Sequence, residues 1–455
     1  MYQELFARES MPVIIGTGIT GMAISRSLSK KKIKHLAIGT PPHPSRPKLG
    51  ESINGEGSLD LEELFPEFSQ YCFPKKNIVF YTGKLVTRCD LDTSMNSIFS
   101  AFFKLTGFKE FKHLFHVDRI GFDLALFESV TQNEHCLFLE QKVTDIIYDR
   151  DRDEIQKLLL EDGSIIHPSF VFDATNHVRL LPKKLEIPCH FFSQKQRIFF
   201  THYRRPNSQF CCSDRQDKTA SWSHSTNLLK LCQELDGIEG MAWCIPLGSY
   251  VSVGMSINAE KYDISDREAI ALLDRAYQQR GIDYRQDYAQ ETEIISVQNQ
   301  YFKHERAGGT NWLLAGGTYS QVWFPTGSGV ATSLYTARFA DRFLKSPQKT
   351  RQQYEHFMSQ FLPSHDVHEQ IITRDIENFT YQQMYRWTDS LLTATLLRIC
   401  TYAQFRNHKL GGLFAKLVKF LIESKILEIK FFCKILESNL DRQTEDTHTE
   451  GLTYL

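Results

Sequence analysis

The segment from Met11 to Ile38 constrains the fold of this chain more than any other part of its sequence. A short apolar run, Val13 to Ile15, is typical of a buried parallel strand, which is covered on both faces and need not alternate. Gly16, Gly18 and Gly21 follow at once in the spacing Gly-x-Gly-x-x-Gly. Apolar residues then recur at helical spacing, and a second apolar run closes the segment. This order predicts a strand, a tight turn, a helix and a second strand.

The three glycines have separate roles in a turn that binds a dinucleotide. Gly16 permits the tight turn, Gly18 lets a pyrophosphate approach the backbone, and Gly21 lets the helix pack close to the strand. The phosphate would lie at the helix N-terminus, where unpaired N–H groups and the helix dipole both favour an anion. Because the glycines lie inside a strand–turn–helix–strand pattern, we interpret them as a dinucleotide-binding loop.

The end of the second strand departs from this motif. Dinucleotide-binding units usually carry Asp or Glu there, and the carboxylate holds the ribose hydroxyls. This chain has Gly39 and Thr40 instead, followed by a proline-rich turn. Two alternatives remain open at this point. Thr40 or a backbone group holds the ribose less tightly, or the unit is purely structural and binds no nucleotide.

The length and composition exclude several classes of protein. The chain has 455 residues, enough to bury one large core or two smaller ones, and a net charge of −1, which gives no global field that would attract nucleic acid. Its ten cysteines are scattered without Cys-x-x-Cys pairs, which argues against a zinc ribbon and for a reducing compartment. Residues 1–10 lack the apolar segment of a signal peptide, and no apolar run reaches membrane-spanning length. We therefore expect a cytoplasmic protein without a nucleic-acid partner.

Alternating and apolar runs predict the other elements of the chain. Residues 187–298 are mostly typical of strands, with an amphipathic helix near 266–280, and predict a separate sheet that faces the substrate. Residues 346–440 are largely helical in pattern, and 441–455 form a polar tail. Shorter elements are expected as a helix at 58–65, a strand pair at 76–89, strands at 136–140, 143–148, 157–160, 169–173 and 312–314, and helices that begin near Asp118 and Val330. Residues 161–164 are expected to form the hairpin turn between the strand at 157–160 and residues 165–166.

Four motifs occur along the chain in an order that is more specific than any one of them alone. They are the glycine loop, Gly50-Glu51-Ser52, the helix start at Asp118-Arg119, and the loop from Pro325 to Gly329. Together they resemble the FAD-dependent aromatic hydroxylase superfamily, and within it the branch of flavin-dependent (tryptophan-type) halogenases and geranylgeranyl-reductase-like enzymes. The resemblance covers about residues 11 to 345, and its cofactor would be FAD.

The resemblance implies an α/β fold with a Rossmann-like FAD-binding domain of the glutathione-reductase-like type, an inserted and mainly antiparallel β-sheet substrate domain, and a C-terminal helical region. The FAD-binding domain would be discontinuous because the N-terminal nucleotide unit and the unit at 312–340 must share one sheet. The expected boundaries are 11–60, 105–180 and 300–345 for the FAD-binding domain, 61–104 and 185–299 for the substrate domain, 346–440 for the helical region and 441–455 for the tail.

The resemblance also implies which residues contact the cofactor. Gly50-Glu51-Ser52 would lie beside the isoalloxazine, Arg119 would reach the cofactor, and the amides of the Pro325–Gly329 loop would face the flavin ring. The full set of expected cofactor-binding residues is Gly16, Gly18, Gly21, Thr40, Glu51, Ser52, Arg119, Val143, Gly316, Pro325, Gly327, Ser328 and Gly329.

Several positions depart from the family pattern. The family has Gly-Asp before the final helix, where the carboxylate holds the ribityl chain, and this chain has Gly316-Gly317. The family segment Asp-Ala-Thr-Gly ends here in Asn176, and the Asp before the active-site proline is Phe324. With Gly39, two expected carboxylate contacts to FAD are absent together. A scaffold that has lost tight FAD binding is therefore one alternative.

Three residues are candidates for catalysis. Halogenases carry Trp-x-Trp-x-Ile-Pro, and this chain keeps the second half with Trp243 but has Met241 in place of the first tryptophan. Halogenases also place a lysine in the substrate chamber, and Lys75, Lys76 and Lys84 lie in the corresponding region. We take Lys76 and Lys84, with Trp243, as the catalytic candidates. The alternative for each lysine is an ordinary solvated side chain.

The resemblance implies chemistry that belongs to the flavin, in which reduced flavin and oxygen act on an organic, aromatic or lipophilic substrate. A separate flavin reductase would supply the electrons. A prenyl-chain or other alkene reductase is the alternative among enzymes. No metal is expected, because His113 and His116 flank an apolar turn without a third ligand.

The C-terminal segment from Leu413 to Leu436 places its charged residues on one helical face and apolar residues over most of the rest. One interpretation is a helix that packs on the catalytic domain. The alternative is an interfacial helix that makes peripheral contact with a membrane and collects a lipophilic substrate.

Overall fold

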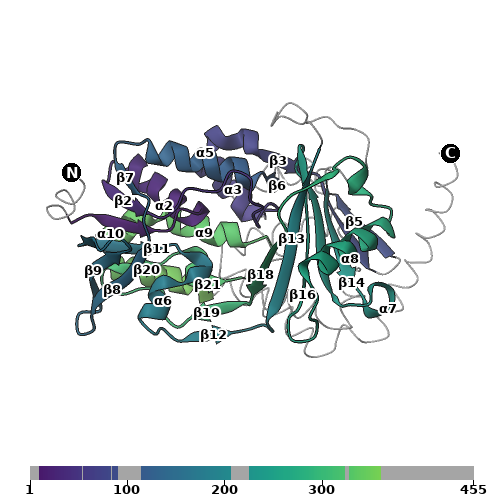
Figure 1. The fold of residues 1–455 in the computed structure, drawn as a ribbon. Coiled ribbons are helices and arrows are strands. Elements are labelled where there is room, and N and C mark those ends of the chain that lie inside the picture. The colour runs from purple at the N-terminus through teal and green to yellow at the C-terminus, as the bar shows by residue number, and fades with distance from the viewer. Residues whose placement is uncertain are drawn as a thin grey trace, which may run out of the picture. The chain divides into compact units, whose positions relative to one another are not determined.

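The structure is a computed structural model that describes residues 10–53, 55–82, 85–90, 114–205, 225–322 and 327–359. All of these belong to one compact unit, Met1–Ser359 (Figure 1). Lys84, Pro325, the segment 413–436, the tail 441–455 and most of the predicted helical region lie outside the described residues. Within the described ranges, none of the helices combines the length and the apolarity needed to cross a bilayer.

A five-stranded parallel sheet forms the first layer, in the order β20-β11-β1-β2-β7. Four of its strands are buried, mainly apolar runs, as expected of a sheet that is covered on both faces, and the edge strand β7 is half-buried after Cys136. The N-terminal nucleotide unit and residues 312–314 therefore share one sheet, as predicted. The strands are β1 Pro12–Ile15, β2 His35–Ile38, β7 Cys136–Leu139, β11 Phe170–Asp173 and β20 Trp312–Leu314.

Helices cover one side of this sheet, and the antiparallel strands β8, β9 and β10 lie on the other (Figure 1). Helix α2 packs between α5 and α9, and its buried face carries small residues that let it approach closely. The helices are α2 Ile19–Lys30, α3 Gly55–Leu64, α5 Arg119–Thr131, α9 Gly329–Arg338 and α10 Ala340–Lys345. The antiparallel strands are β8 Val143–Asp149, β9 Glu154–Leu160 and β10 Ile165–Ile166, and the predicted hairpin at 161–164 joins the last two.

The second layer is a large sheet in the order β17-β13-β16-β15-β14-β4-β5, with β18 also paired to β13. All its pairs are antiparallel except β14 with β4. The predicted strand pair at 76–89 is confirmed as its edge. The strands are β4 Asn77–Thr82, β5 Leu85–Asp90, β13 Gln196–Arg204, β14 Ser225–Leu231, β15 Gly240–Pro246, β16 Tyr250–Asn258, β17 Gln290–Glu291 and β18 Ile295–Asn299.

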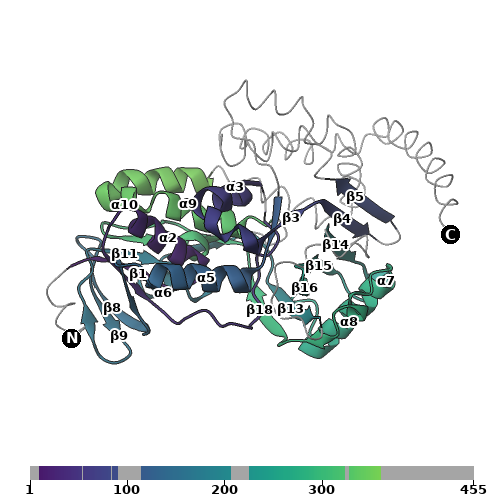
Figure 2. The same cartoon turned by 90° about the horizontal axis from the view of Figure 1, so that it is seen from above.

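Alternation along these strands gives the sheet two different apolar faces. Phe199 and Cys244 pack with helix α8 (Asp266–Gln278) in one core cluster, and Ser265 caps that helix in a capping box. Phe200 and Trp243, one residue away on the same strands, belong to a second cluster on the opposite face. That second face looks toward the parallel sheet and its helices (Figure 2).

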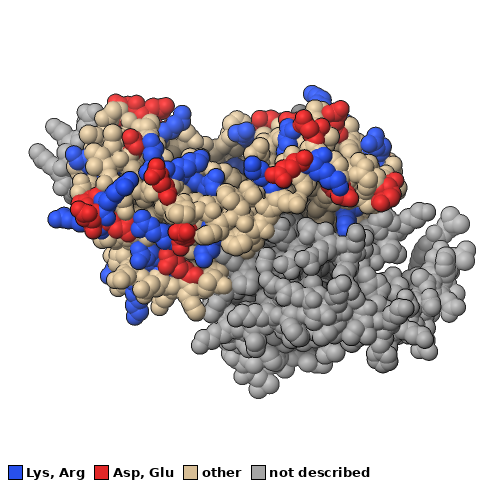
Figure 3. Space-filling view, turned by 90° about the horizontal axis from the view of Figure 1, so that it is seen from below, with Lys and Arg blue, Asp and Glu red and all other residues tan. Residues whose placement is uncertain are grey.

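Short elements connect the two layers. The strands β3 Cys72–Lys75 and β6 Leu114–Val117 pair with each other, and β12 Cys189–Phe191, β19 Phe302–His304 and β21 Ser320–Gln321 form a small antiparallel sheet. The short helices are α6 Leu180–Lys184, α7 Gln233–Asp236, η1 Pro66–Tyr71, η3 Asn176–Val178, η4 Tyr284–Gln286 and η5 Gly316–Thr318. Acidic and basic side chains are interspersed over the described face in Figure 3, in keeping with the near-neutral chain.

Candidate active site

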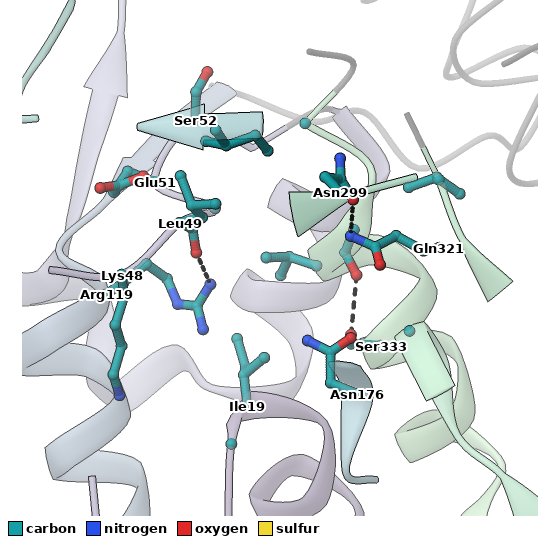
Figure 4. Close-up of a pocket in the computed structure, with 18 of the residues that line it drawn as sticks. Ile19, Lys48, Leu49, Glu51, Ser52, Arg119, Asn176, Asn299, Gln321 and Ser333 are labelled. Atoms are coloured by element: carbon teal, nitrogen blue, oxygen red, sulfur yellow. Dashed lines mark hydrogen bonds between the residues drawn. The ribbon is translucent and has the colours of Figure 1, made fainter. Parts of the chain in front are cut away.

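A cavity of about 450 Å³ lies between the helix N-termini of the parallel layer and the inner face of the large sheet. Figure 4 shows Arg119 and Asn176 on opposite sides of it, with Ile19 between them. Segments far apart in the sequence contribute its walls. The lining residues include Gly18, Glu51, Ser52, Arg119, Asn176, Ile198, Phe200, Thr226, Leu228, Trp243, Ile245, Val297, Gly317, Gly327 and Gly329.

Only part of the predicted set lines this cavity. Glu51, Ser52, Arg119 and Trp243 do so, together with the glycines at 18, 327 and 329. The expected residues Gly16, Gly21, Thr40, Val143, Gly316, Ser328 and Lys76 are not among the lining residues. Lys84 and Pro325 lie outside the described residues, so their positions stay predictions.

The glycine loop has the geometry that the sequence motif requires. Gly16 has a φ of +109°, and a Cβ there would lie 2.6 Å from the Ala174 carbonyl oxygen. A Cβ on Gly21 would overlap the carbonyl oxygen of Gly16, so only glycine lets α2 approach the turn. At Gly18, in contrast, no described atom lies within 4 Å of an added Cβ. The space beside Gly18 is open to the cavity, at a helix start with no side-chain cap.

A second helix begins at the same cavity. Helix α9 starts at Gly329, and its N-cap Ser328 forms no side-chain cap. An added Cβ on Gly329 would meet no atom of a described residue within 4 Å. The hydroxyls of Thr332 and Ser333 donate to the Gly329 carbonyl oxygen over 2.9 Å each. Because α2 and α9 pack together, the positive ends of two helix dipoles lie close to one volume.

Arg119 adds a fixed positive charge to this volume. It is 7% exposed, and its guanidinium donates to both carboxylate oxygens of Asp123 over 3.1 Å and to the Leu49 carbonyl oxygen over 2.9 Å. Lys48 Nζ lies 3.0 Å from the same carboxylate. Burial alone would raise the pKa of Asp123, but Arg119 and Lys48 hold it below its usual value. At the cavity these two cations stand beside two carboxylates, those of Asp123 and Glu51.

Glu51 belongs to a buried polar network that the sequence analysis did not find. Its Oε1 lies 3.1 Å from Nε2 of His202, and both side chains are 1% exposed. The His202 ring stacks on Tyr250 with ring centres 4.5 Å apart. The Tyr250 hydroxyl donates to Asp118 Oδ1 over 3.0 Å, and the same oxygen accepts from the N–H groups of Ile120 and Gly121. Burial raises the pKa of Asp118 even though these hydrogen bonds oppose the shift.

Ser52 leads to a second buried network, which contains a lysine. Its hydroxyl lies 3.1 Å from Thr226 Oγ1, which lies 2.7 Å from Nε2 of His116. Lys75 Nζ donates to Ser52 Oγ over 3.1 Å and to the Ile53 carbonyl oxygen over 3.3 Å, and its side chain is 5% exposed. Lys76, its neighbour, is exposed. Lys75, the last residue of β3, is therefore buried, and the predicted Lys76, just after the strand, is not.

The large sheet supplies an apolar wall. Trp243 is 4% exposed, and its indole N–H donates to Ser252 Oγ over 3.4 Å. Gly254 on the neighbouring strand leaves room for this ring, because a Cβ there would overlap it. Trp243 lines the cavity as expected, together with the apolar side chains Ile198, Phe200, Leu228, Ile245 and Val297.

The two missing carboxylates have steric explanations. A Cβ on Gly39 would lie 2.8 Å from Cγ2 of Thr17, whose hydroxyl donates to the Thr40 carbonyl oxygen. A Cβ on Gly317 would overlap Oδ1 of Asn176, which occupies that space. Thr17 at the first position and Asn176 at the second thus occupy the space that a carboxylate side chain would need.

These residues fit a dinucleotide that lies beside an apolar chamber. An open glycine turn, two helix N-termini and Arg119 suit an anionic linker, and the wall around Trp243 suits a planar organic group. Among the described residues, no group of three His, Cys, Asp or Glu side chains could hold a metal ion.

Comparison with known proteins identifies the fold. No protein-family model matches the chain, and no curated protein matches it by sequence. The solved structure of the flavin-dependent brominase Bmp2 matches with a TM-score of 0.66 and 17% identity, over 92% of this chain and 99% of that one. A flavoprotein/dehydrogenase from Cytophaga hutchinsonii matches with a TM-score of 0.66 and 16% identity, over 90% and 99%.

The halogenase PltM matches with a TM-score of 0.59 and 17% identity, over 92% of this chain and 84% of its own. The resemblance inferred from the four motifs is thus confirmed at the level of architecture. The chain has the α/β fold of the flavin-dependent halogenases, with a Rossmann-like parallel layer and an antiparallel sheet against it.

Proposed function

We propose that this protein is an FAD-dependent oxidoreductase of the monooxygenase/halogenase type that acts on an aromatic or lipophilic organic substrate with reduced flavin and oxygen. One observation carries the proposal. A single cavity joins two helix N-termini and the buried Arg119 to the apolar wall around Trp243. The similar halogenase PltM has been crystallised with phloroglucinol and FAD, a phenolic compound and the proposed cofactor.

The cofactor would be held by the backbone of this cavity more than by side-chain charge. The amides at the start of α2, beside Gly18, would bind the pyrophosphate, and the Gly327–Gly329 turn would face the polar edge of the ring. Arg119 would place its guanidinium near the anionic groups, fixed by Asp123 and the Leu49 carbonyl. Bound FAD supplies the redox chemistry with oxygen, and the protein supplies binding, orientation and exclusion of water.

The apolar wall would exclude water from the reacting volume and orient a planar substrate. Ile198, Phe200 and Trp243 are 1%, 3% and 4% exposed, so they are held rigidly by their neighbours. A dry chamber limits loss of a reactive oxidant to solvent. The brominase Bmp2 shares this architecture, which makes bromide the first halide to test.

We propose Lys75, in place of Lys76, as the lysine of the halogenase type. Its ammonium is buried and reaches Ser52, which lines the cavity, through one hydrogen bond of 3.1 Å. Through this bond the buried cation would polarise the Ser52 hydroxyl, which could then donate a hydrogen bond to an electrophilic halogen species in the cavity and direct it toward the substrate. An exposed lysine such as Lys76 cannot do this, because water competes for its protons.

Lysine variants test the proposal. The purified full chain receives reduced FAD, oxygen, bromide and a panel of phenols and indoles, and products are identified by mass spectrometry. We expect brominated product in the wild type and in Lys76→Ala, and its loss in Lys75→Ala. Oxygenated product that does not depend on bromide would assign the monooxygenase branch. Turnover that needs only an alkene, without oxygen, would overturn the proposal in favour of a reductase.

Two further parts of the proposal concern partners. We propose a separate flavin reductase as electron donor, so NADH alone should leave the bound FAD oxidised and an added reductase should reduce it.

We also keep peripheral membrane contact through residues 413–436 as a proposal, because that stretch has the amphipathic pattern of an interfacial helix. Deleting residues after Gly411 should then abolish sedimentation with anionic liposomes.

A further inference from the structure

Asn176 and Gly317 compete for one volume at the edge of the cavity. Both residues line the cavity, and a Cβ on Gly317 would overlap the side-chain oxygen of Asn176. Gly317 does not have a φ in the left-handed region, so its backbone does not require glycine. The reason for glycine at this position is therefore the space that the Asn176 amide occupies.

The backbone directs the Asn176 side chain into the cavity. Its φ is +52°, a left-handed conformation that Asn adopts more readily than most other residues with a Cβ. Its N–H donates to Thr318 Oγ1 over 2.8 Å, and its carbonyl oxygen accepts from Arg179 N over 3.2 Å. Both backbone groups are thus anchored, and the direction of the side chain follows from them.

The side-chain amide has no assigned role within the protein. Asn176 is exposed to the cavity, and its amide makes no hydrogen bond with any residue that the structure describes. Figure 4 shows it pointing into the cavity near Ser333, across from Arg119. It stands between the start of α2 at Ile19 and the start of α9, where the polar linker of a dinucleotide would cross.

We propose that the Asn176 amide binds the polar linker of FAD between its ring and its adenosine, and that Gly317 is kept as glycine to make room for it. This inference rests on the proposed FAD site. An amide offers two N–H donors and one carbonyl acceptor, which suits a chain of hydroxyl groups. Being neutral, it also avoids the repulsion that a carboxylate would add beside the phosphates.

The test is a thermodynamic cycle on FAD affinity that does not depend on catalysis. The dissociation constant for FAD is measured by flavin fluorescence on the wild type, Asn176→Gly, Gly317→Ala and the double variant. Glycine at 176 keeps the backbone conformation, and alanine at 317 only displaces the amide. We expect each single change to weaken FAD binding by about tenfold, the loss of one or two hydrogen bonds.

The double variant distinguishes this mechanism from independent damage. Gly317→Ala acts only by displacing the amide, so it should cause no further loss of FAD affinity once Asn176 is glycine. The double variant should therefore bind FAD about as well as Asn176→Gly. Circular dichroism spectra like that of the wild type would show that all variants are folded.

Two results would overturn the inference while leaving the FAD site intact. One is wild-type affinity in Asn176→Gly. The other is a loss of FAD affinity on Gly317→Ala that is as large in the Asn176→Gly variant as in the wild type. A wild type that binds no FAD at all would instead overturn the proposed function, and this inference with it.

Discussion

Oε1 of Glu51 and Nε2 of His202 lie 3.1 Å apart in the interior, although 151 residues separate them in the chain. The loop that follows the proline-rich turn carries Glu51, and the large sheet carries His202. The contact therefore joins the loop before α3 to the large sheet. It also lies directly behind the cavity wall, because Glu51 lines the cavity.

Removing the Glu51 carboxylate should destabilise the protein. In Glu51→Ala the buried His202 ring would lose its Nε2 partner, and its Nδ1 atom already lacks a hydrogen-bond partner among the described residues. We expect the free energy of unfolding to fall by about 1–3 kcal/mol, the cost of an unsatisfied buried polar group. Urea denaturation measures this, and Glu51→Gln, which keeps an oxygen acceptor, should lose less. Equal losses in both variants would show that the hydrogen bond to His202 is not the cause.

Substitutions at Gly18 and Gly21 should have different effects, the first on cofactor binding and the second on folding. Gly18→Val points a side chain into open space, so the fold should survive while FAD binding is abolished. Gly21→Ala places a Cβ against the Gly16 carbonyl oxygen, so it should lower the thermal midpoint and the yield of folded protein. Thermal melts and FAD titration check both. A folded Gly18→Val protein with wild-type FAD affinity would contradict the placement of the cofactor at α2.

The Asp123 carboxylate should make the free energy of unfolding depend on pH in acidic solution. Its pKa in the folded state lies below its ordinary value of 3.8, because Arg119 and Lys48 outweigh the effect of burial. The unfolded chain therefore binds the proton more readily, and stability is lost as the pH falls from about 4 through the folded-state pKa. In Asp123→Asn this contribution should be absent. Urea unfolding of both proteins at pH 5 and at pH 3 should show a smaller difference between the two pH values in the variant.

Trp243 should control substrate affinity without affecting the cofactor. Trp243→Ala removes the largest side chain of the apolar wall and should lower the free energy of unfolding by about 3–5 kcal/mol. We expect a higher KM for aromatic substrates and an unchanged dissociation constant for FAD. Trp243→Phe, which keeps an aromatic ring, serves as the matched control. A large loss of FAD affinity in Trp243→Phe would mean that this ring contacts the flavin directly.

The features that follow from local sequence could be predicted. The glycine loop, the buried strands and the hairpin at 161–164 each depend on a few neighbouring residues, and the structure confirms them. The prediction that β1 and β20 share a sheet depended on the order of the four motifs along the chain. No local pattern places residues 312–314 beside residues 170–173.

The contacts that assemble the cavity wall could not be predicted in the same way. His202, Thr226 and Tyr250 meet Glu51, Ser52 and Asp118 through strand pairing, and nothing near them in sequence marks them. The choice between Lys75 and Lys76 depends on the register of β3 with β6, and a shift of one residue exchanges them. Asn176 had a visible signal, because Asn and Gly occupy the family positions of Gly and Asp, but only the structure shows that the two changes share one volume.

The central claim is that FAD binds in the cavity between α2, α9 and the large sheet. The most direct measurement is a titration of the purified full chain with FAD. Binding is monitored by flavin fluorescence and by the absorption band of oxidised flavin at roughly 450 nm. The account predicts saturable binding of one FAD per chain that is lost in folded Gly18→Val. No change in the flavin spectrum on addition of protein, or equal binding by both proteins, would contradict it.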